Sequence, residues 1–130
     1  MQVLLDTHAW AWTLVDDPML SPGARQAVAD ADAVFVSPVS LFEFSQKVRF
    51  GKWPEMADRL DRLPGTLAEQ GGLSATLTFE AALYAGRLEW AHRDPLDRIL
   101  AATAVLGGLA LVSADVVFDS FPDPGLSRIW

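Results

Sequence analysis

Short apolar runs alternate with longer segments of helical periodicity along this chain. The runs over 2–5 (Gln-Val-Leu-Leu), 33–36 (Ala-Val-Phe-Val) and 109–112 (Leu-Ala-Leu-Val) each stop at a polar or turn-forming residue, and they predict buried strands. A last short strand is expected over 126–130. Strands that are continuously apolar and separated by helices are typical of a parallel sheet covered on both faces. We therefore predict an α/β fold in a single domain over residues 1–130.

Six segments between these strands predict helices, each bounded by recognisable signals. They cover residues 7–15, 21–30, 40–50, 54–63, 78–91 and 95–106. Ser21-Pro22 and Asp94-Pro95 are strong starts, because each pairs an N-cap residue with a proline at the first helical position. Gly51, Pro64-Gly65 and Gly107-Gly108 are natural stops.

Composition narrows the classes of protein that this sequence can be. About half of the 130 residues are hydrophobic (51%) and 21% are charged, so the chain can bury a core and is not disordered. It has no cysteine, which excludes disulfides, thiolate nucleophiles and cysteine zinc sites. No basic leader precedes the first apolar run, and the longest apolar stretch, over 99–112, is interrupted by glycines. We expect a cytoplasmic protein that does not associate with membranes.

The formal net charge of −7 argues against a protein that holds nucleic acid by overall charge. It does not argue against an enzyme that acts on nucleic acid, because acidic clusters loaded with divalent cations carry less negative charge than the formal count.

Four acids fall at positions that a parallel sheet would bring together. Asp6 ends the first strand, and Asp115 follows the strand over 109–112. Glu43 lies in the first turns of the helix after the second strand, and Asp97 lies in the first turn of the helix over 95–106. Because ligands of such sheets bind beyond the carboxyl ends of the strands, we expect these carboxylates to converge there.

A cluster of carboxylates needs a counter-charge, and hard oxygen ligands select Mg²⁺ or Mn²⁺. One ion, or a pair about 3.5–4 Å apart, can orient a phosphate, acidify a water and stabilise a leaving oxygen. That chemistry cleaves phosphodiesters without a protein nucleophile.

Each acid taken alone also has a structural interpretation. Asp6 can cap the helix that follows it. Glu43 can pair with Lys47 one helical turn on, which is as good an interpretation as metal binding. Asp97 can complement the helix dipole, and Asp115 can be a turn residue. The hypothesis of a metal site depends on all four acids together.

Four segments, in order, carry a resemblance to a known family. They are residues 4–10 (Leu-Leu-Asp-Thr-His-Ala-Trp), 40–52 with Glu43, 92–102 (His-Arg-Asp-Pro-Leu-Asp-Arg-Ile-Leu-Ala-Ala) and 111–115 (Leu-Val-Ser-Ala-Asp). With this order and spacing, the whole chain resembles PIN-domain ribonucleases of the VapC-like toxin group.

The resemblance implies a fold, an activity and partners. The fold would be a PIN-like three-layer arrangement with a central, mainly parallel sheet flanked by helices. The activity would be that of a Mg²⁺- or Mn²⁺-dependent endoribonuclease, which hydrolyses RNA phosphodiesters with a metal-activated water. The partners would be RNA, a small cognate antitoxin and a second copy of the chain in a homodimer. By motif position, the catalytic and metal-binding acids are Asp6, Glu43, Asp97 and Asp115.

Several further residues are expected to assist these acids. Thr7, Asp94 and Ser113 are candidates for supporting the ligands, with Asp94 also the expected helix cap and Ser113 standing where the family often has threonine. Basic side chains near the acids are candidate RNA contacts, with solvated charge an equal alternative; they are Lys47, Arg49, Arg93 and Arg98.

The sequence also contains two histidines, and two alternative functions are weighed against the nuclease. A structural or solvent-facing role is favoured for His8 and His92, because the sequence offers neither a partner residue. An aspartyl phosphotransferase with Asp6 as nucleophile is disfavoured, since His8 stands where a second acid is needed. The other rival is a catalytically silent PIN-fold module that binds protein or RNA.

Overall fold

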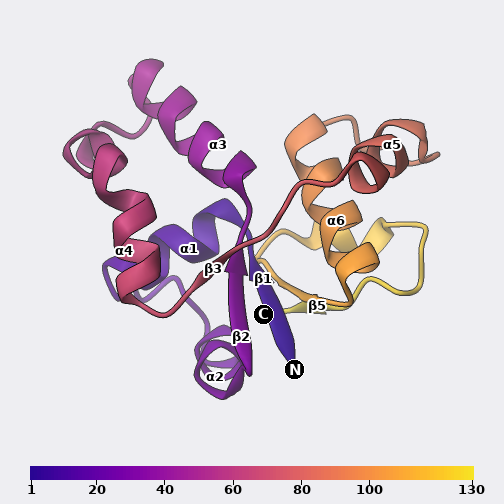
Figure 1. Ribbon diagram of the computed structural model, residues 1–130, viewed down its shortest axis with the longest axis horizontal. Helices are drawn as coiled ribbons and strands as arrows, with labels where there is room; N and C mark the ends of the chain where they lie inside the picture. The colour runs from indigo at the N-terminus through magenta and orange to yellow at the C-terminus, as the bar shows by residue number, and fades with distance from the viewer.

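A five-stranded sheet runs through the middle of the molecule in the computed structural model, which describes all 130 residues (Figure 1). Its spatial order is β3-β2-β1-β4-β5, and every neighbouring pair of strands is parallel. The strands are β1 (Gln2–Leu5), β2 (Ala33–Val36), β3 (Leu73–Ser74), β4 (Ala110–Val112) and β5 (Arg128–Ile129). The predicted α/β fold with a central parallel sheet is confirmed.

Helices cover both faces of the sheet and make the three layers seen in Figure 1. On one side lie α1 (Thr7–Leu14), α2 (Pro22–Asp30), α3 (Pro38–Arg49), the 3₁₀ helix η1 (Pro54–Arg62) and α4 (Leu63–Glu69). On the other side lie α5 (Phe79–Arg87), α6 (Pro95–Gly107) and the 3₁₀ helix η2 (Val116–Ser120).

The alternation of side chains along each strand divides the core between these layers. Val3 and Leu5 of β1 pack with α1 and α3, whereas Leu4 packs with α6 on the opposite face. All three are at most 2% exposed, and burying each stabilises the fold by about 1.5–3 kcal/mol. The part of β1 that is buried on both faces, Val3 to Leu5, is therefore continuously apolar.

The segment after Trp53 differs from the prediction. One helix ended by Pro64-Gly65 was expected over 54–63, but the chain forms η1 and then continues directly into α4, which includes both Pro64 and Gly65. Pro64 is the second residue of α4, where its missing N–H would have had no helical partner, so it starts a helix there and does not end one.

Two helix boundaries and one strand also differ from the prediction. Helix α3 begins at Pro38 and not at residue 40, because the Ser37 side chain caps it by accepting from the Val39 N–H. Helix α5 ends at Arg87 and not at residue 91. The two-residue strand β3 was not predicted; it pairs with β2 at the edge of the sheet and its side chains are exposed.

The strand order creates a natural binding edge at the carboxyl end of β1. In the sheet, β2 and β3 lie on one side of β1, and β4 and β5 lie on the other. The direction in which successive strands are added therefore reverses at β1. Such a reversal opens a crevice beyond the strand ends. The first residues after β1 and β4 are Asp6 and Ser113, and the Asp6 N–H donates to the Val112 carbonyl at 3.1 Å. None of the helices combines the length and the apolar character needed to cross a bilayer.

Candidate metal centre

Asp6 is placed by the junction between β1 and α1. Its Oδ1 accepts from the Ala9 N–H at 2.8 Å, so it caps α1 as the structural interpretation expected. Capping uses one oxygen only. The residue is 9% exposed and lines the cleft at the edge of the sheet, so capping and a role in the cleft are compatible.

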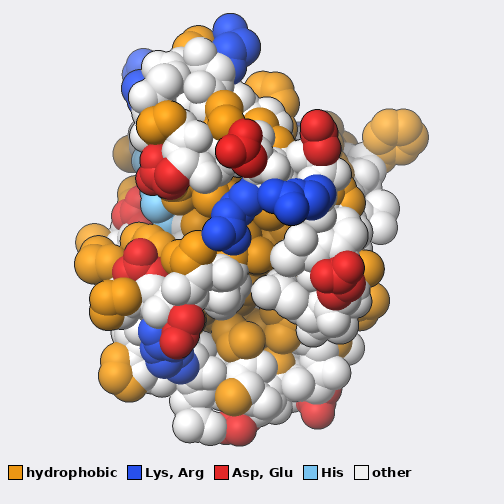
Figure 2. All heavy atoms as spheres, turned by 90° about the vertical axis from the view of Figure 1, so that its left-hand side faces the viewer, with side chains coloured by type: hydrophobic (Ala, Val, Ile, Leu, Met, Phe, Trp, Pro, Cys, Tyr) orange, Lys and Arg blue, Asp and Glu red, His pale blue; other side chains and the backbone are white.

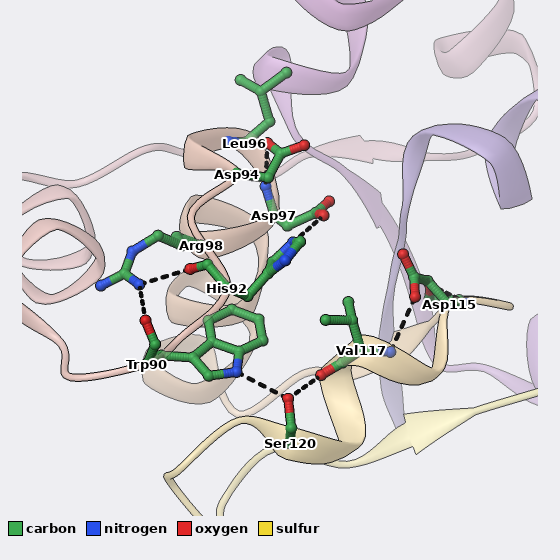
Figure 3. A network of polar contacts seen from close by, with 10 residues as sticks. Trp90, His92, Asp94, Leu96, Asp97, Arg98, Asp115, Val117 and Ser120 are labelled. Atoms are coloured by element: carbon green, nitrogen blue, oxygen red, sulfur yellow. Dashed lines mark hydrogen bonds and ion pairs between the residues drawn. The ribbon is translucent and has the colours of Figure 1, made fainter.

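Asp97 projects from the first turn of α6 and has a partner that the sequence did not suggest. His92 Nε2 lies 2.7 Å from Asp97 Oδ2 (Figure 3). The interpretation of His92 as lacking a partner was therefore wrong. The two residues are separated by the α6 N-cap, Asp94, and the turn that it makes brings the imidazole back to the carboxylate.

Glu43 and Asp115 complete the acidic lining from two other segments. Glu43 lies on α3, half-buried, and the alternative of an ion pair with Lys47 is not realised. Asp115 is exposed and caps η2, its Oδ1 accepting from the Val117 N–H at 2.9 Å. In Figure 3 the Asp115 carboxylate lies across the cleft from Asp97.

The structure brings all four predicted acids to one cleft of about 190 Å³. The acids that line it are Asp6, Glu43, Asp97 and Asp115, and the other lining residues are Thr7, His8, Lys47, Asp94, Leu100 and Phe118. The four carboxylates therefore line a single cleft, as a shared metal site requires.

Proton affinities within the cleft reflect the crowding of negative charge. Burial raises the pKa of Asp97 to about 6, against the lowering effect of the His92 hydrogen bond, and the charges of Asp94 and Glu43 add to the rise. Burial also raises the pKa of Asp6, although the Ser113 hydroxyl and the Ala9 N–H oppose it. Both carboxylates are thus destabilised as anions and would be stabilised by a cation.

The wall that carries Asp97 is held by a network of hydrogen bonds (Figure 3). The Arg98 guanidinium donates to four backbone carbonyls, those of Ala85 in α5 and of Leu88, Trp90 and His92 in the turn before α6. The Trp90 indole N–H donates to Ser120 Oγ at 2.9 Å, which links this turn to η2. Because Asp115 caps η2, the same network relates the two sides of the cleft.

The three supporting residues occupy distinct positions. Asp94 caps α6, its Oδ1 accepting from the Leu96 N–H at 2.9 Å and from the Asp97 N–H at 3.4 Å. Ser113 is fully buried, and its Oγ accepts from the Asp115 N–H at 3.0 Å. Thr7 does not cap α1; its hydroxyl donates to Ser40 Oγ at 3.1 Å and joins α1 to α3.

The four basic candidates separate into different environments. Lys47 lines the cleft, whereas Arg93 is exposed beside the Asp97 wall and Arg49 lies over the Phe50 ring. Arg98 donates to the four carbonyls named above and so holds the turn before α6. A phosphate contact by Arg98 stays a prediction from the sequence.

The donor set fits a hard divalent cation. The cleft offers carboxylate oxygens from four separate segments and contains no thiol, and its one imidazole besides His92, that of His8, bonds to none of the four acids. Side-chain donor atoms of His92, Asp94 and Asp97 lie within 4.8 Å of one another. Since His92 already bonds to Asp97, it is better placed to orient that carboxylate than to bind an ion itself.

Sequence comparison places the chain in a known family. The PIN domain family model matches residues 3–124. Ribonuclease VapC22 of Mycobacterium tuberculosis is 28% identical over 134 residues, which cover 98% of this chain and 98% of that protein. With a match over nearly its whole length, the chain belongs to the PIN domain family.

Solved structures share the fold at low identity. VapBC2 of Rickettsia felis, bound to a DNA fragment from its promoter, aligns with a TM-score of 0.70 at 18% identity and covers 98% of this chain and 97% of that one. FitAcB of Neisseria gonorrhoeae aligns with a TM-score of 0.65 at 18% identity, covering 98% and 96%. A toxin–antitoxin complex of Klebsiella pneumoniae aligns at 0.59 and 19%, covering 95% and 94%. The PIN-like fold expected from the motifs is thereby confirmed.

Proposed function

We propose that this protein is a Mg²⁺- or Mn²⁺-dependent endoribonuclease and the toxin of a toxin–antitoxin pair. The observation that carries the proposal is the convergence of four carboxylates in one cleft, two of them with raised pKa values. Membership of the PIN domain family and the similarity to a named ribonuclease support it.

The bound cation would supply the chemistry of phosphodiester hydrolysis, by orienting a phosphate and lowering the pKa of a water. The residues of the chain hold and shape that site. Asp6, Asp97 and Asp115 present carboxylates from the ends of β1, α6 and η2, and Glu43 presents one from α3. His92 orients the Asp97 carboxylate and Ser113 holds the backbone of Asp115, and both thereby restrict where a phosphate can lie.

Cleavage of labelled RNA by the purified chain tests this function directly. We expect cleavage in Mg²⁺ or Mn²⁺, none in EDTA, and a loss of roughly 100-fold or more in Asp6→Asn and Asp97→Asn, because each removes a ligand charge from the site. Glu69→Gln is the matched control, since Glu69 is an exposed acid on α4 outside the cleft.

A second readout follows metal binding without activity. Mg²⁺ is expected to raise the melting temperature of the wild type and of Glu69→Gln, and to leave that of Asp6→Asn unchanged. Cleavage that persists in EDTA would refute the metal role. RNA cleavage and toxicity that are unaffected by Asp6→Asn and Asp97→Asn would favour the silent binding module.

An antitoxin and a second copy of the chain are the proposed protein partners. Hydrophobic side chains are exposed between acidic and basic ones on the α3–α4 side of the molecule (Figure 2). A largely apolar hollow of about 290 Å³ opens there, lined by residues that include Trp10, Leu41, Pro64 and Leu67. Exposed apolar surface of this kind is typical of an interaction site. Co-expression with the product of an adjacent short reading frame should suppress RNA cleavage and yield a complex on gel filtration.

A further inference from the structure

A column of aromatic rings stands directly beside the acidic cleft. Phe44, fully buried on α3, stacks on Trp53 with ring centroids 4.8 Å apart and planes 29° apart. Trp53 in turn stacks on His8 at 5.3 Å and 25°. Trp12 packs against His8 from within α1 at 5.7 Å. The column therefore begins in the core and ends at an exposed ring.

The exposed end of this column lies within the site itself. His8 lines the same cleft as Asp6, from which it is separated by one residue. Its imidazole makes no hydrogen bond to any of the four acids, unlike that of His92. The metal site therefore leaves the ring unexplained, although the rings behind it hold it in place.

A positive charge accompanies the column. Lys47 lines the cleft, and its Nζ lies 3.4 Å from His8 Nε2 and 5.4 Å from the centroid of the Trp53 ring. It forms no ion pair. A flat aromatic surface with an unpaired ammonium beside it is the combination by which proteins bind single-stranded nucleic acid, with bases on the rings and phosphates on the cation.

We propose that His8, backed by Trp53, is a stacking platform for one unpaired base of the RNA, and that Lys47 holds a phosphate next to that base. This inference rests on the proposed nuclease function and adds the requirement that the substrate is unpaired at that nucleotide. A base inside a duplex presents no free face to the ring, so single strands and loops would bind in preference to helices.

A double-mutant cycle between protein and RNA tests the stacking. The probe is a fluorescein-labelled single-stranded oligouridine, and affinity is measured by anisotropy in Ca²⁺, which prefers oxygen ligands as Mg²⁺ does. A set of the same oligomers carries one abasic ribose at successive positions. We expect one abasic position to weaken binding to the wild type roughly tenfold, the stacking contribution of one base. In His8→Ala the same abasic position should have no further effect.

Two variants separate stacking from other roles of these residues. His8→Phe keeps a flat ring and should retain the affinity, which a role of the ring nitrogens would not allow. Lys47→Gln should weaken binding and reduce the salt dependence of log K by about 0.7, the effect of one phosphate contact on a single strand, whereas His8→Ala should leave that slope unchanged. Phe79→Ala is the matched control, because Phe79 is an exposed ring on α5 outside the cleft.

Additive effects of His8→Ala and the abasic position would overturn the platform, as would equal affinity of His8→Ala and the wild type or undetectable binding of the oligouridine. Loss of antitoxin binding in His8→Ala with unchanged RNA affinity would likewise overturn it and assign the ring to a protein interface. The failure of the proposed function has a different signature, which is cleavage in EDTA or full activity in Asp6→Asn.

Discussion

The two walls of the acidic cleft are held by different forces. The wall formed by α6 and the turn before it is fixed by hydrogen bonds, with His92 on Asp97 and Arg98 on four carbonyls. The wall formed by α1 and α3 is held by ring packing, in which Phe44, Trp53 and the exposed His8 follow one another.

This difference suits two different tasks. Hydrogen bonds are directional, so a wall built from them keeps a carboxylate at a fixed position where it can serve as a ligand. Ring packing is less directional, so a wall built from it offers a flat surface that tolerates different bases. Substitutions that remove a polar contact from the hydrogen-bonded wall are therefore expected to destabilise the fold, whereas a substitution at His8, the exposed end of the ring-packed wall, should change its stability little.

The largest effect on the hydrogen-bonded wall is expected for Arg98→Ala. It leaves four partly buried carbonyls without their donor, and each such loss costs on the order of 1 kcal/mol. Urea denaturation should show a loss of about 3–4 kcal/mol in the free energy of unfolding. Arg93→Ala, an exposed arginine five residues earlier, should change it by less than about 0.5 kcal/mol. Similar values for the two variants would contradict the role of Arg98 as a fold determinant.

The next largest effect is expected for Asp97→Asn, whose effect on stability should have opposite signs in EDTA and in Mg²⁺. Its pKa in the folded protein, about 6, lies above the ordinary value of 3.8, so the folded state binds this proton more tightly than the unfolded state does. Ionisation of Asp97 therefore costs no stability below about pH 4, costs progressively more as the pH rises to about 6, and costs a constant amount above that.

Asp97→Asn should consequently stabilise the protein in EDTA at pH 7, by about 1–2 kcal/mol after allowance for partial exposure. The gain should disappear below about pH 4. In saturating Mg²⁺ the order should reverse, because the wild type then gains the binding energy of the ion. Thermal melts across pH, with and without Mg²⁺, check this. A variant less stable than the wild type in EDTA at pH 7 would contradict it.

The smallest effect is expected between Glu43 and Lys47 on the other wall. They are one helical turn apart but form no ion pair, so the stability cycle of Glu43→Ala, Lys47→Ala and the double variant should give a coupling below about 0.3 kcal/mol. A coupling above about 0.5 kcal/mol would contradict this prediction and show that Glu43 and Lys47 form an ion pair that stabilises the fold.

Much of the fold could be predicted because its signals are local. The strands over 2–5, 33–36 and 109–112 are apolar at every position except Gln2, and the parallel sheet that they imply is present. Gly108 ends α6 in the left-handed conformation with φ of 66°, as a glycine stop predicts. The strand β3 was missed because two exposed residues that pair only with an edge carry no such pattern.

Some features of the candidate site likewise have a local sequence signal, and others do not. The four acids could be chosen from the sequence because strand ends of a parallel sheet meet at one edge. The partner of His92 and the carbonyls around Arg98 could not, because both depend on how the turn before α6 folds back. The stacking of His8 on Trp53 joins residues 45 positions apart, and no local pattern signals it.

The sequence by itself determined the layers of this protein and the acids of its cleft, since hydrophobic periodicity and the positions of strand ends are written in neighbouring residues. Only the tertiary structure decided which histidine supports an acid, which arginine supports the backbone and which rings face the cleft. Those assignments depend on distances between segments far apart in the chain, and such distances are set by packing and not by local preference.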